Sequence, residues 1–213
     1  MANHVDTYVS FNRISEAGQK RFAELCSRLD GWNTEGAYSF NMHEIFGLEE
    51  SEDGPGTYNW NIENIGAKWC YMEDCGDDGF RTQSAWAVPF DGIQYILGEI
   101  YKADPTLVAT IVYEDEMPNF VGWATWNNEC WDEGREWQWE EMQQHMLDEH
   151  EDLRAEWIED DEDWTDTGRE LAWDYTRDFI DTVVWETLQE EVNWFYEHEH
   201  DDEEYTEGVR NAI

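Results

Sequence analysis

The chain has 213 residues, of which 52 are acidic and 12 are basic, so its formal net charge is −40. Such a charge is common in disordered chains, but those are poor in aromatic residues, whereas 15% of this chain is aromatic and 14 residues are tryptophans. The composition therefore predicts a folded protein with a negative surface, which repels nucleic acid and anionic membranes and attracts basic proteins.

The sequence gives no reason to expect an export signal or a membrane-spanning segment. The N-terminus, Met1–Asp6, lacks the basic and apolar regions of a signal peptide, and no run of about 18 apolar residues occurs. The cysteines are few and irregularly spaced for a disulfide framework; they are Cys26, Cys70, Cys75 and Cys130. We therefore expect a cytoplasmic protein with reduced thiols.

The first elements in chain order are predicted to be a strand and a helix. Thr7–Phe11 alternates between polar and apolar residues, which is typical of a strand. Ser15 follows as an N-cap, and the helix after it has one apolar face. That face consists of Phe22, Leu25, Cys26 and Leu29. Residues 31–58 are rich in Gly and Asn and predict a long connection with a short helix near His43–Phe46.

Strands and one more helix follow. Phe80–Val88 is a strand candidate that Pro89 ends, and Asp91–Tyr101 has the apolar spacing of an amphipathic helix. Leu107–Tyr113 and Phe120–Trp126 then predict two strands around a turn. The order of strand, helix, strands, helix, strands is typical of a small α+β sandwich.

Three strings of residues in this part share the motifs of one family. They are Trp60–Trp69, which reads Trp-x-x-Glu-Asn-x-Gly-x-Lys-Trp, then Ala85–Pro89, which reads Ala-Trp-x-x-Pro, and Tyr113–Gly122, which contains Tyr-x-x-Glu and Phe-x-Gly. In this order they resemble the signature of the YubB-type ferredoxin-like domain family of plasmids and phages. The resemblance covers about residues 59–127. It implies a ferredoxin-like sandwich, an antiparallel sheet with two helices, and no established chemistry.

The first of these strings also has a candidate site. Turn and packing roles account for most of it: Gly66 makes a turn, Trp60 and Trp69 pack, and Asn64 caps. The alternative is a functional pocket in a small enzyme that uses Glu63 and Lys68. No nucleophile–base pair, phosphate loop or histidine-rich ligand set joins these two residues in the sequence, so we predict no enzyme, no cofactor and no metal.

Charge divides the chain near Asn127-Asn128. Residues 1–127 hold 21 acids and 7 bases, whereas the shorter part, residues 128–213, holds 31 acids and 5 bases. We therefore predict two packed parts without a flexible linker. The first is a ferredoxin-like α+β domain with a loop insertion at about 31–58, and the second is an acidic, Trp-rich helical region packed on it.

The second part is predicted to be helical. Glu136–Leu147 and Glu151–Ile158 are acidic, contain no proline and have few β-branched residues. A longer helix is predicted from Thr167 to about Glu197, with one apolar stripe that docks it on a neighbour or on the sheet. The stripe consists of Phe179, Val183, Val184, Leu188, Val192 and Phe195.

The acidity of this part is comparable with that of a nucleic acid. Thirty-one acids among residues 128–213 give one charge every ~4.2 Å of helix axis, or every ~2.1 Å for two helices side by side. Duplex DNA carries one charge every ~1.7 Å. We therefore predict a non-enzymatic inhibitor of phage or mobile-element type that mimics nucleic acid. Its partner would be a basic nucleic-acid-binding host protein, a defence or transcription factor, in the host cytoplasm.

The predicted partner-binding residues lie around an acidic run that contains two tryptophans. Trp157 and Trp164 are seven residues apart, so they would face one way if a single helix ran through both. Aromatic anchors within a charged rim are typical of tight protein interfaces, although burial of both in the core is an equally good interpretation. The predicted residues are Glu149, Asp152, Glu156, Trp157, Glu159, Asp160, Asp161, Glu162, Asp163, Trp164 and Asp166.

Three alternatives remain for the acidic surface. Adaptation to high salt also produces acidic surfaces, and it would make the protein an α+β domain without any role as a mimic. Residues Asp163–Asp174 faintly resemble a calcium loop, with threonines at two ligand positions and Asp in place of the final Glu. Tryptophans beside carboxylates also suit carbohydrate binding. The sequence decides neither the host partner nor the oligomeric state.

Overall fold

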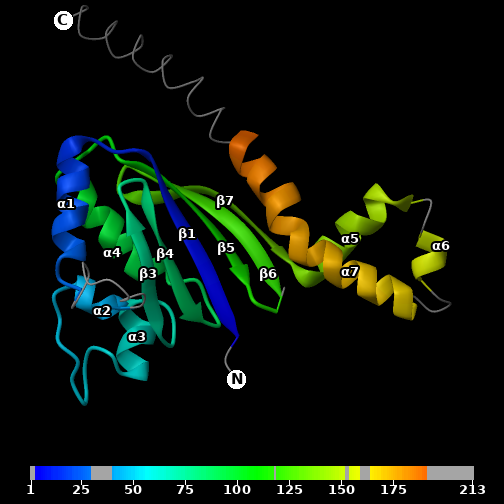
Figure 1. Ribbon diagram of the computed structural model, residues 1–213, viewed down its shortest axis with the longest axis horizontal. Coiled ribbons are helices and arrows are strands. Elements are labelled where there is room, and N and C mark those ends of the chain that lie inside the picture. The colour runs from blue at the N-terminus through cyan, green and yellow to red at the C-terminus, as the bar shows by residue number, and fades with distance from the viewer. Residues whose placement is uncertain (1–2, 30–39, 118, 152–153, 159–163, 191–213) are drawn as a thin grey trace, which may run out of the picture.

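The computed structural model describes residues 3–29, 40–117, 119–151, 154–158 and 164–190. In these ranges the chain is an α+β protein with a seven-stranded antiparallel sheet, several helices and a C-terminal helix of 25 residues. One half of that helix lies against the sheet, and the other half extends beyond the sheet as an arm (Figure 1).

The sheet has its longest strand near the centre. The strands are β1 (His4–Arg13), β2 (Phe40–Asn41), β3 (Cys70–Gly76), β4 (Gly79–Ala85), β5 (Val108–Asp115), β6 (Phe120–Asn127) and β7 (Cys130–Gln138). They lie in the order β2-β3-β4-β1-β5-β6-β7, and all neighbours are antiparallel. The strands predicted within β1, β4, β5 and β6 are confirmed, although β4 ends at Ala85 rather than Val88.

Four helices lie on one face of this sheet: α1 (Glu16–Cys26), α2 (Met42–Ile45), α3 (Tyr58–Asn64) and α4 (Phe90–Tyr101). The predicted N-cap is confirmed, since the Ser15 side chain accepts a hydrogen bond from the Gly18 amide at 3.4 Å. The core between α1, α4 and the sheet includes Phe22, Leu25, Ile93, Ile96, Leu97, Ile100, Val5, Val9 and Ile111.

The connections follow a simple rule. With β2, α2 and α3 left aside as an insertion between α1 and β3, the chain runs through β1, α1, β3, β4, α4 and β5, while these strands lie in the order β3-β4-β1-β5 in the sheet. Each of the two long helices therefore joins a strand to its next neighbour but one. β4 therefore lies between β1 and β3, and β1 lies between β4 and β5.

Three elements between α1 and β4 were not predicted: β2, which lies in the segment assigned to a connection, β3 and α3. β3 was missed because Glu73 and Asp74 obscure its alternation, and the strand pairs irregularly with β4 at this point. Residues 58–64 were assigned to connection and turn but form α3. The turn role of Gly66 is confirmed by its φ of 89°, and the Asn64 side chain donates a hydrogen bond to the Trp60 carbonyl at 2.9 Å.

The boundary in composition at Asn127-Asn128 is not a boundary in structure. Asn128 and Glu129 have φ values of 46° and 67°, which form a two-residue turn of the kind that joins tight hairpins. β7 follows and pairs with β6 in the same sheet. The prediction that residues 128–213 are wholly helical is therefore wrong for β7, and the helix predicted from Glu136 begins at Trp139.

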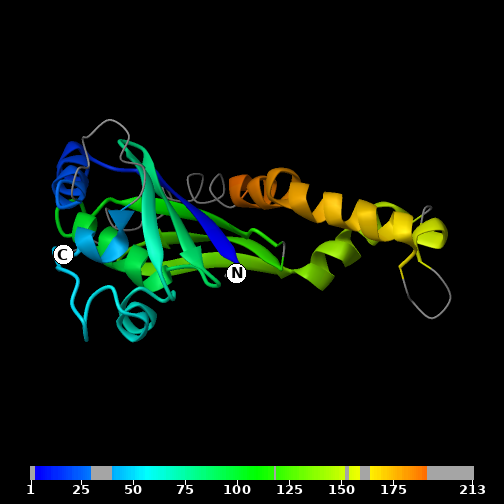
Figure 2. The ribbon, with the colours of Figure 1, turned by 60° about the horizontal axis from the view of Figure 1, so that its bottom comes forward.

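The helices of the acidic part form a second layer. They are α5 (Trp139–Glu149), α6 (Arg154–Trp157) and the C-terminal helix, which comprises α7 (Asp166–Phe179), a π-helical turn (Ile180–Val184) and a further helical segment to residue 190. Figure 2 shows this layer and the arm from the side. Its sheet contact consists of Val112, Val121, Trp123 and Trp137 against Phe179, Ile180, Val184 and Leu188.

The predicted apolar stripe is confirmed as far as the structure describes it. Phe179, Val184 and Leu188 are buried, and Val183 is partly buried against the same cluster. Val192, Phe195 and the predicted helix end at Glu197 lie outside the described residues.

Candidate interaction surface

The C-terminal helix packs on the rest of the protein through one regular row of residues. Every fourth residue is buried, and this buried row consists of Gly168, Ala172, Thr176, Ile180, Val184 and Leu188. A repeat of four is longer than the helical repeat of 3.6, so the row turns gradually around the helix. The turning matches a change of neighbour, because Ala172 packs on α5 and α6 whereas Ile180 and Leu188 pack on the sheet.

A second line of residues carries charge along the opposite side of the same helix. This carboxylate row consists of Asp166, Glu170, Asp174, Asp178, Glu186 and Glu190, all of them exposed. Each member except Glu190 stands two positions before a member of the buried row, and Glu190 continues the spacing of four residues from Glu186. Two residues that are two positions apart lie about 200° apart around a helix. The carboxylates therefore face away from the docked side along the whole helix.

The change of neighbour coincides with a change in helix geometry. The Trp185 amide donates to the Ile180 carbonyl, five residues back, which is the π-helical pattern. Within this turn Thr182 interrupts the carboxylate row, and its hydroxyl donates to the Asp178 carbonyl at 3.1 Å. The extra residue in the turn keeps Val184 and Leu188 directed at the sheet.

α5 packs beside α7 and adds further exposed carboxylates (Figure 1). They are Glu140, Glu141, Asp148 and Glu149. With the carboxylate row and Asp181, the two helices present a carboxylate every ~3.3 Å along the ~36 Å of the longer helix. This is sparser than the ~2.1 Å predicted from composition, and it equals the ~3.4 Å spacing of charges along one DNA strand.

Few of these carboxylates are neutralised within the molecule. Among the described residues of α5 and the C-terminal helix, Arg169 forms an ion pair with Asp166 at 3.8 Å, and the Nδ1 atom of His145 lies 3.9 Å from the Glu149 carboxylate. Glu149 also accepts a hydrogen bond of 2.6 Å from the Tyr175 hydroxyl. Burial raises the pKa of Tyr175, and Glu149 raises it further.

The predicted tryptophan anchors do not lie on one helix. α6 ends at Trp157, Ile158 and Trp164 form a β-bridge, and the Thr165 amide donates to the Trp157 carbonyl at 2.9 Å. Trp157 is only 7% exposed, because it packs on Met146, Leu147 and Ala172. Trp164 is partly buried against the same cluster. The condition under which the two tryptophans would face one way, a single helix through both, is not met, because Ile158 and Trp164 form an antiparallel bridge.

The other predicted binding residues divide into two groups. Glu149, Glu156 and Asp166 are exposed on the described surface. Asp152, Glu159, Asp160, Asp161, Glu162 and Asp163 lie outside the described residues. Sequence reasoning missed Trp173, which is 38% exposed and lies 5.8 Å from the Trp139 ring. The sign of this exposure in the sequence is that Trp173 directly follows Ala172, a member of the buried row.

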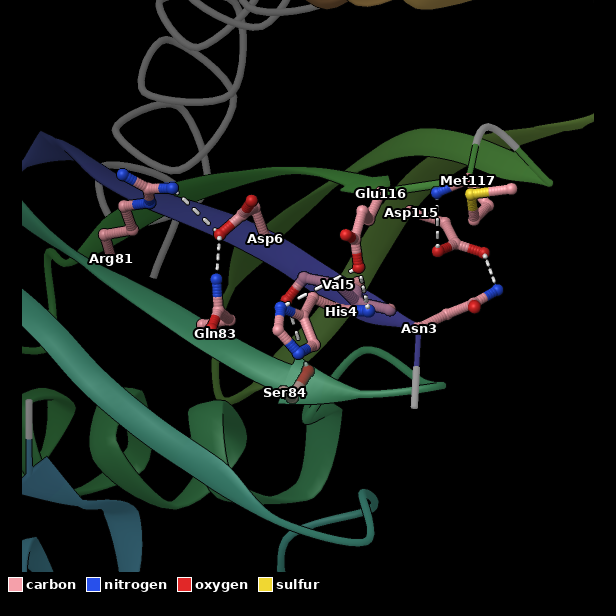
Figure 3. A network of polar contacts seen from close by, with 10 residues as sticks. All are labelled: Asn3, His4, Val5, Asp6, Arg81, Gln83, Ser84, Asp115, Glu116 and Met117. Carbon is pink, nitrogen blue, oxygen red and sulfur yellow. Dashed lines mark hydrogen bonds and ion pairs between the residues drawn. The ribbon is translucent and has the colours of Figure 1, made fainter. Parts of the chain in front are cut away.

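A polar cavity of about 370 Å³ lies where this helix meets the sheet. His4, Asp6 and Gln83 line it from the sheet, and Thr176 and Arg177 line it from α7. Figure 3 shows Arg81 and Gln83 directed at Asp6, with hydrogen bonds of 2.9 and 3.5 Å. The cavity therefore joins the strands to the acidic helix through polar groups.

The end of β5 supplies the acidic wall of the same cavity, residues Glu114 to Glu116. Burial raises the pKa of Glu114, and the nearby Asp6 and Asp181 raise it further. Asp115 is buried and accepts a hydrogen bond from the Asn119 side chain. Figure 3 shows the two other hydrogen bonds that it accepts, from the Asn3 side chain at 3.5 Å and from the Met117 amide at 3.3 Å. No cluster of metal-binding side chains occurs in the described part of the chain.

The surroundings of Lys68 differ from the predicted site that pairs it with Glu63. The Lys68 ammonium lies 5.8 Å from the Tyr58 ring and 5.6 Å from the Trp86 ring. Trp86 is 63% exposed and has a φ of 70°. Glu63 is exposed on α3, and no ion pair joins it to Lys68 within the described ranges.

The calcium-loop alternative is not supported by the local structure. The Thr165 hydroxyl accepts a hydrogen bond from the Gly168 amide at 3.0 Å and caps α7. Residues from Asp166 onward are helical, so they cannot form a ligand loop ending at Asp174.

The chain matches no protein-family model, no curated protein and no solved structure. No helix in the described ranges is long and apolar enough to span a membrane.

Proposed function

We propose that this chain is a non-enzymatic mimic of nucleic acid that occupies the DNA- or RNA-binding surface of a basic host protein. The observation that carries the proposal is the carboxylate row, which faces outward along a docked helix and has α5 beside it. Over the two helices together, a basic groove built for a phosphate strand would meet about one carboxylate per ~3.3 Å of axis, which is close to the ~3.4 Å per charge of that strand.

The regularity of the row supports this function over a generally acidic surface. Like charges four residues apart destabilise a helix by about 0.2–0.5 kcal/mol per pair. The sequence nevertheless repeats them at Asp166, Glu170, Asp174 and Asp178. The row thus opposes the stability of its own helix, which the buried row opposite must supply.

The topology supports the suggested family. Apart from the insertion of β2, α2 and α3, the run β1-α1-β3-β4-α4-β5 and the strand order β3-β4-β1-β5 support a ferredoxin-like sandwich, to which β6, β7 and β2 would add edges. Together with the YubB-type motifs, this favours a phage or mobile-element origin. A defence or transcription factor in the host cytoplasm is then the partner that we propose.

A capture experiment tests the mimicry. The immobilised protein is exposed to bacterial lysate, and bound proteins are displaced with short duplex DNA at micromolar concentration, which leaves the ionic strength unchanged. We expect nucleic-acid-binding proteins to be captured and displaced. The variant Glu170→Gln/Asp174→Asn/Asp178→Asn should retain about ten-fold less of them, since three adjacent contacts are lost.

A matched variant separates position from net charge. Glu49→Gln/Glu52→Gln/Asp53→Asn removes three exposed carboxylates from the loop before α3 and should bind as the parent does. Equal capture by both variants would show that the row is only a solvated face. Failure to fold does not confuse the result, because the row variant removes repulsion within α7.

A further inference from the structure

The sheet ends in an edge strand that is long enough to pair with another chain. β7 is last in the sheet order, and in the described part of the chain only β6 pairs with it. Its register shifts opposite Thr125, whose hydroxyl accepts from the Glu133 amide at 3.1 Å. Beyond this bulge, residues 134–138 pair regularly with residues 120–124. An edge strand of this kind can receive an extended peptide by strand addition.

An apolar groove of about 500 Å³ lies beside this edge, on the face of the sheet that carries α4. Phe90, Tyr113 and Trp131 form aromatic walls, with ring centroids 5.2 Å apart for Phe90 and Trp131 and 5.8 Å apart for Phe90 and Tyr113. Ala124 and Gly134 also line it. The groove is therefore close to the backbone of β7 and bounded by rings.

Two glycines at or next to the groove, Gly122 and Gly134, have no room for a larger side chain. Gly122 has no side chain, and a Cβ there would meet the Tyr113 hydroxyl at 2.5 Å. A Cβ on Gly134 would lie 3.0 Å from the Trp123 carbonyl and 3.2 Å from the Ala124 side chain. The packing of the strands thus keeps both positions free of side chains, and the aromatic walls stay open.

The rim of the groove is negative. Asp91, Asp132, Glu133 and Glu136 line it. The Tyr113 hydroxyl donates to Glu136 at 3.1 Å, and burial, followed by Glu136, raises the pKa of Tyr113. Arg135, the one base in β7, places its guanidinium 4.4 Å from the Trp137 ring, which belongs to the cluster on the opposite face of the sheet. Arg135 also lines the groove, and Asp132 accepts a hydrogen bond from the Asn127 side chain at 2.8 Å. Within the described ranges no ion pair joins the rim carboxylates to a base, so the rim keeps its negative charge for a cationic partner.

We propose that β7 and its groove bind an extended basic segment of a partner protein by strand addition, with an arginine side chain in the groove. A guanidinium group stacks on aromatic rings and pairs with carboxylates, so it fits both the walls and the rim. A second copy of this chain is disfavoured as occupant, because β7 would place Asp132, Glu133 and Glu136 against their own charge. This site does not depend on the carboxylate row.

A short synthetic peptide of alternating arginine and valine, labelled with fluorescein, tests the proposal by anisotropy at about 150 mM salt, where distant charges are screened. Binding to the parent should weaken about ten-fold when alternate peptide amides are methylated, because strand pairing needs them. Bound peptide should also slow amide exchange in residues 134–138. Peptide binding that ignores methylation, or protection confined to other segments, would overturn strand addition.

Two groove variants locate the site. Trp131→Ala should weaken peptide binding about ten-fold by removing one wall. Because Trp131 also touches the core, Asp132→Asn/Glu133→Gln serves as a second variant with only exposed changes, and it should weaken binding about three-fold or more. Unchanged affinity in both variants would place the peptide elsewhere and reject the groove.

The carboxylate-row variant separates this inference from the proposed function. Glu170→Gln/Asp174→Asn/Asp178→Asn should leave peptide affinity within about two-fold of the parent, because the groove lies on the other face of the sheet. If that variant loses the peptide while the groove variants keep it, the groove proposal fails and mimicry stands. If the groove variants lose the peptide and the carboxylate-row variant keeps it, the groove proposal is supported, whether or not the protein mimics nucleic acid.

Discussion

Tryptophans of the acidic helices differ in what surrounds them, and this decides what each can contribute. Trp157 is 7% exposed among Met146, Leu147 and Ala172, whereas Trp173 is 38% exposed and touches Trp139. The sequence places both among carboxylates and gives no sign of the difference. Burial makes Trp157 a core residue and leaves Trp173 available to a partner.

Replacing these two tryptophans by alanine should therefore have unequal effects on stability. Trp157→Ala should lower the free energy of unfolding by about 3–5 kcal/mol, the range for a large buried side chain. Trp173→Ala should cost about 1 kcal/mol, because much of its ring is already hydrated. Urea denaturation followed by circular dichroism measures both, and equal losses would contradict the assigned burial.

Glu114 links stability to pH, because it is partly buried at the polar cavity where the C-terminal helix meets the sheet. Its raised pKa means that the folded state holds the carboxyl proton more tightly than the unfolded chain. Below the pKa that Glu114 has in the unfolded chain, the group therefore does not lower the free energy of unfolding. As the pH rises through its pKa in the folded state, the free energy of unfolding falls. The window lies above about pH 4, the ordinary range of a glutamate.

Glu114→Gln should remove this cost. We expect a higher urea midpoint than that of the parent at pH 7, with the difference shrinking as the pH is lowered toward 5. Glu63→Gln, at an exposed position on α3, serves as the control and should show no such trend. A difference between Glu114→Gln and the parent that grows on acidification would reverse the sign and refute the assignment.

Helix α7 begins against a neighbouring backbone, which makes its first turn sensitive to size. A Cβ on Gly168 would meet the Trp157 carbonyl oxygen closer than real Cβ atoms approach. The same oxygen accepts the Thr165 amide at 2.9 Å, so it cannot move without losing that bond. Gly98, inside α4, has nothing within 4 Å of the corresponding position.

Alanine at these two helical glycines should act in opposite directions. Gly98→Ala should stabilise the protein by about 0.5–1 kcal/mol, because alanine loses less backbone freedom on folding. Gly168→Ala should destabilise it by about 1–3 kcal/mol through overpacking. Thermal unfolding of the two variants gives the comparison, and a stabilised Gly168→Ala would show that α6 and α7 are not packed as described.

Elements with strong periodicity were predictable, and those with interrupted patterns were not. β1 buries every second residue, and α4 buries residues three or four positions apart. The local sequence pattern therefore predicts both elements. β7 buries only Trp137 and has charges at four of its other eight positions, so its sequence lacks the alternation of a strand. The turn at Asn128 and Glu129 nevertheless brings it back along β6.

The whole molecule repels itself, and salt should relieve this. Raising NaCl from about 10 mM to about 100 mM shortens the Debye length from ~30 Å to ~10 Å. With a net charge of −40, the urea midpoint should rise over this range. The salt-adapted alternative expects a protein that stays unfolded until molar salt is present, so a folded state at 100 mM argues against it.

The same field should prevent direct contact with nucleic acid. Duplex DNA should show no mobility shift with this protein at about 10 mM salt, where electrostatic attraction or repulsion is strongest. The basic peptide described above is the positive control under these conditions. A DNA shift would contradict both the electrostatic reasoning and the proposed mimicry.

The sequence by itself determined the α+β class, the negative surface and the apolar stripe of the last helix, because these depend on composition and on spacing along one chain segment. Only the tertiary structure decided that Trp157 is core, that β7 extends the sheet and that the carboxylate row faces away from the docked side. Each of these depends on which distant segment packs on a residue. A buried and an exposed tryptophan are identical in sequence, and packing alone separates them.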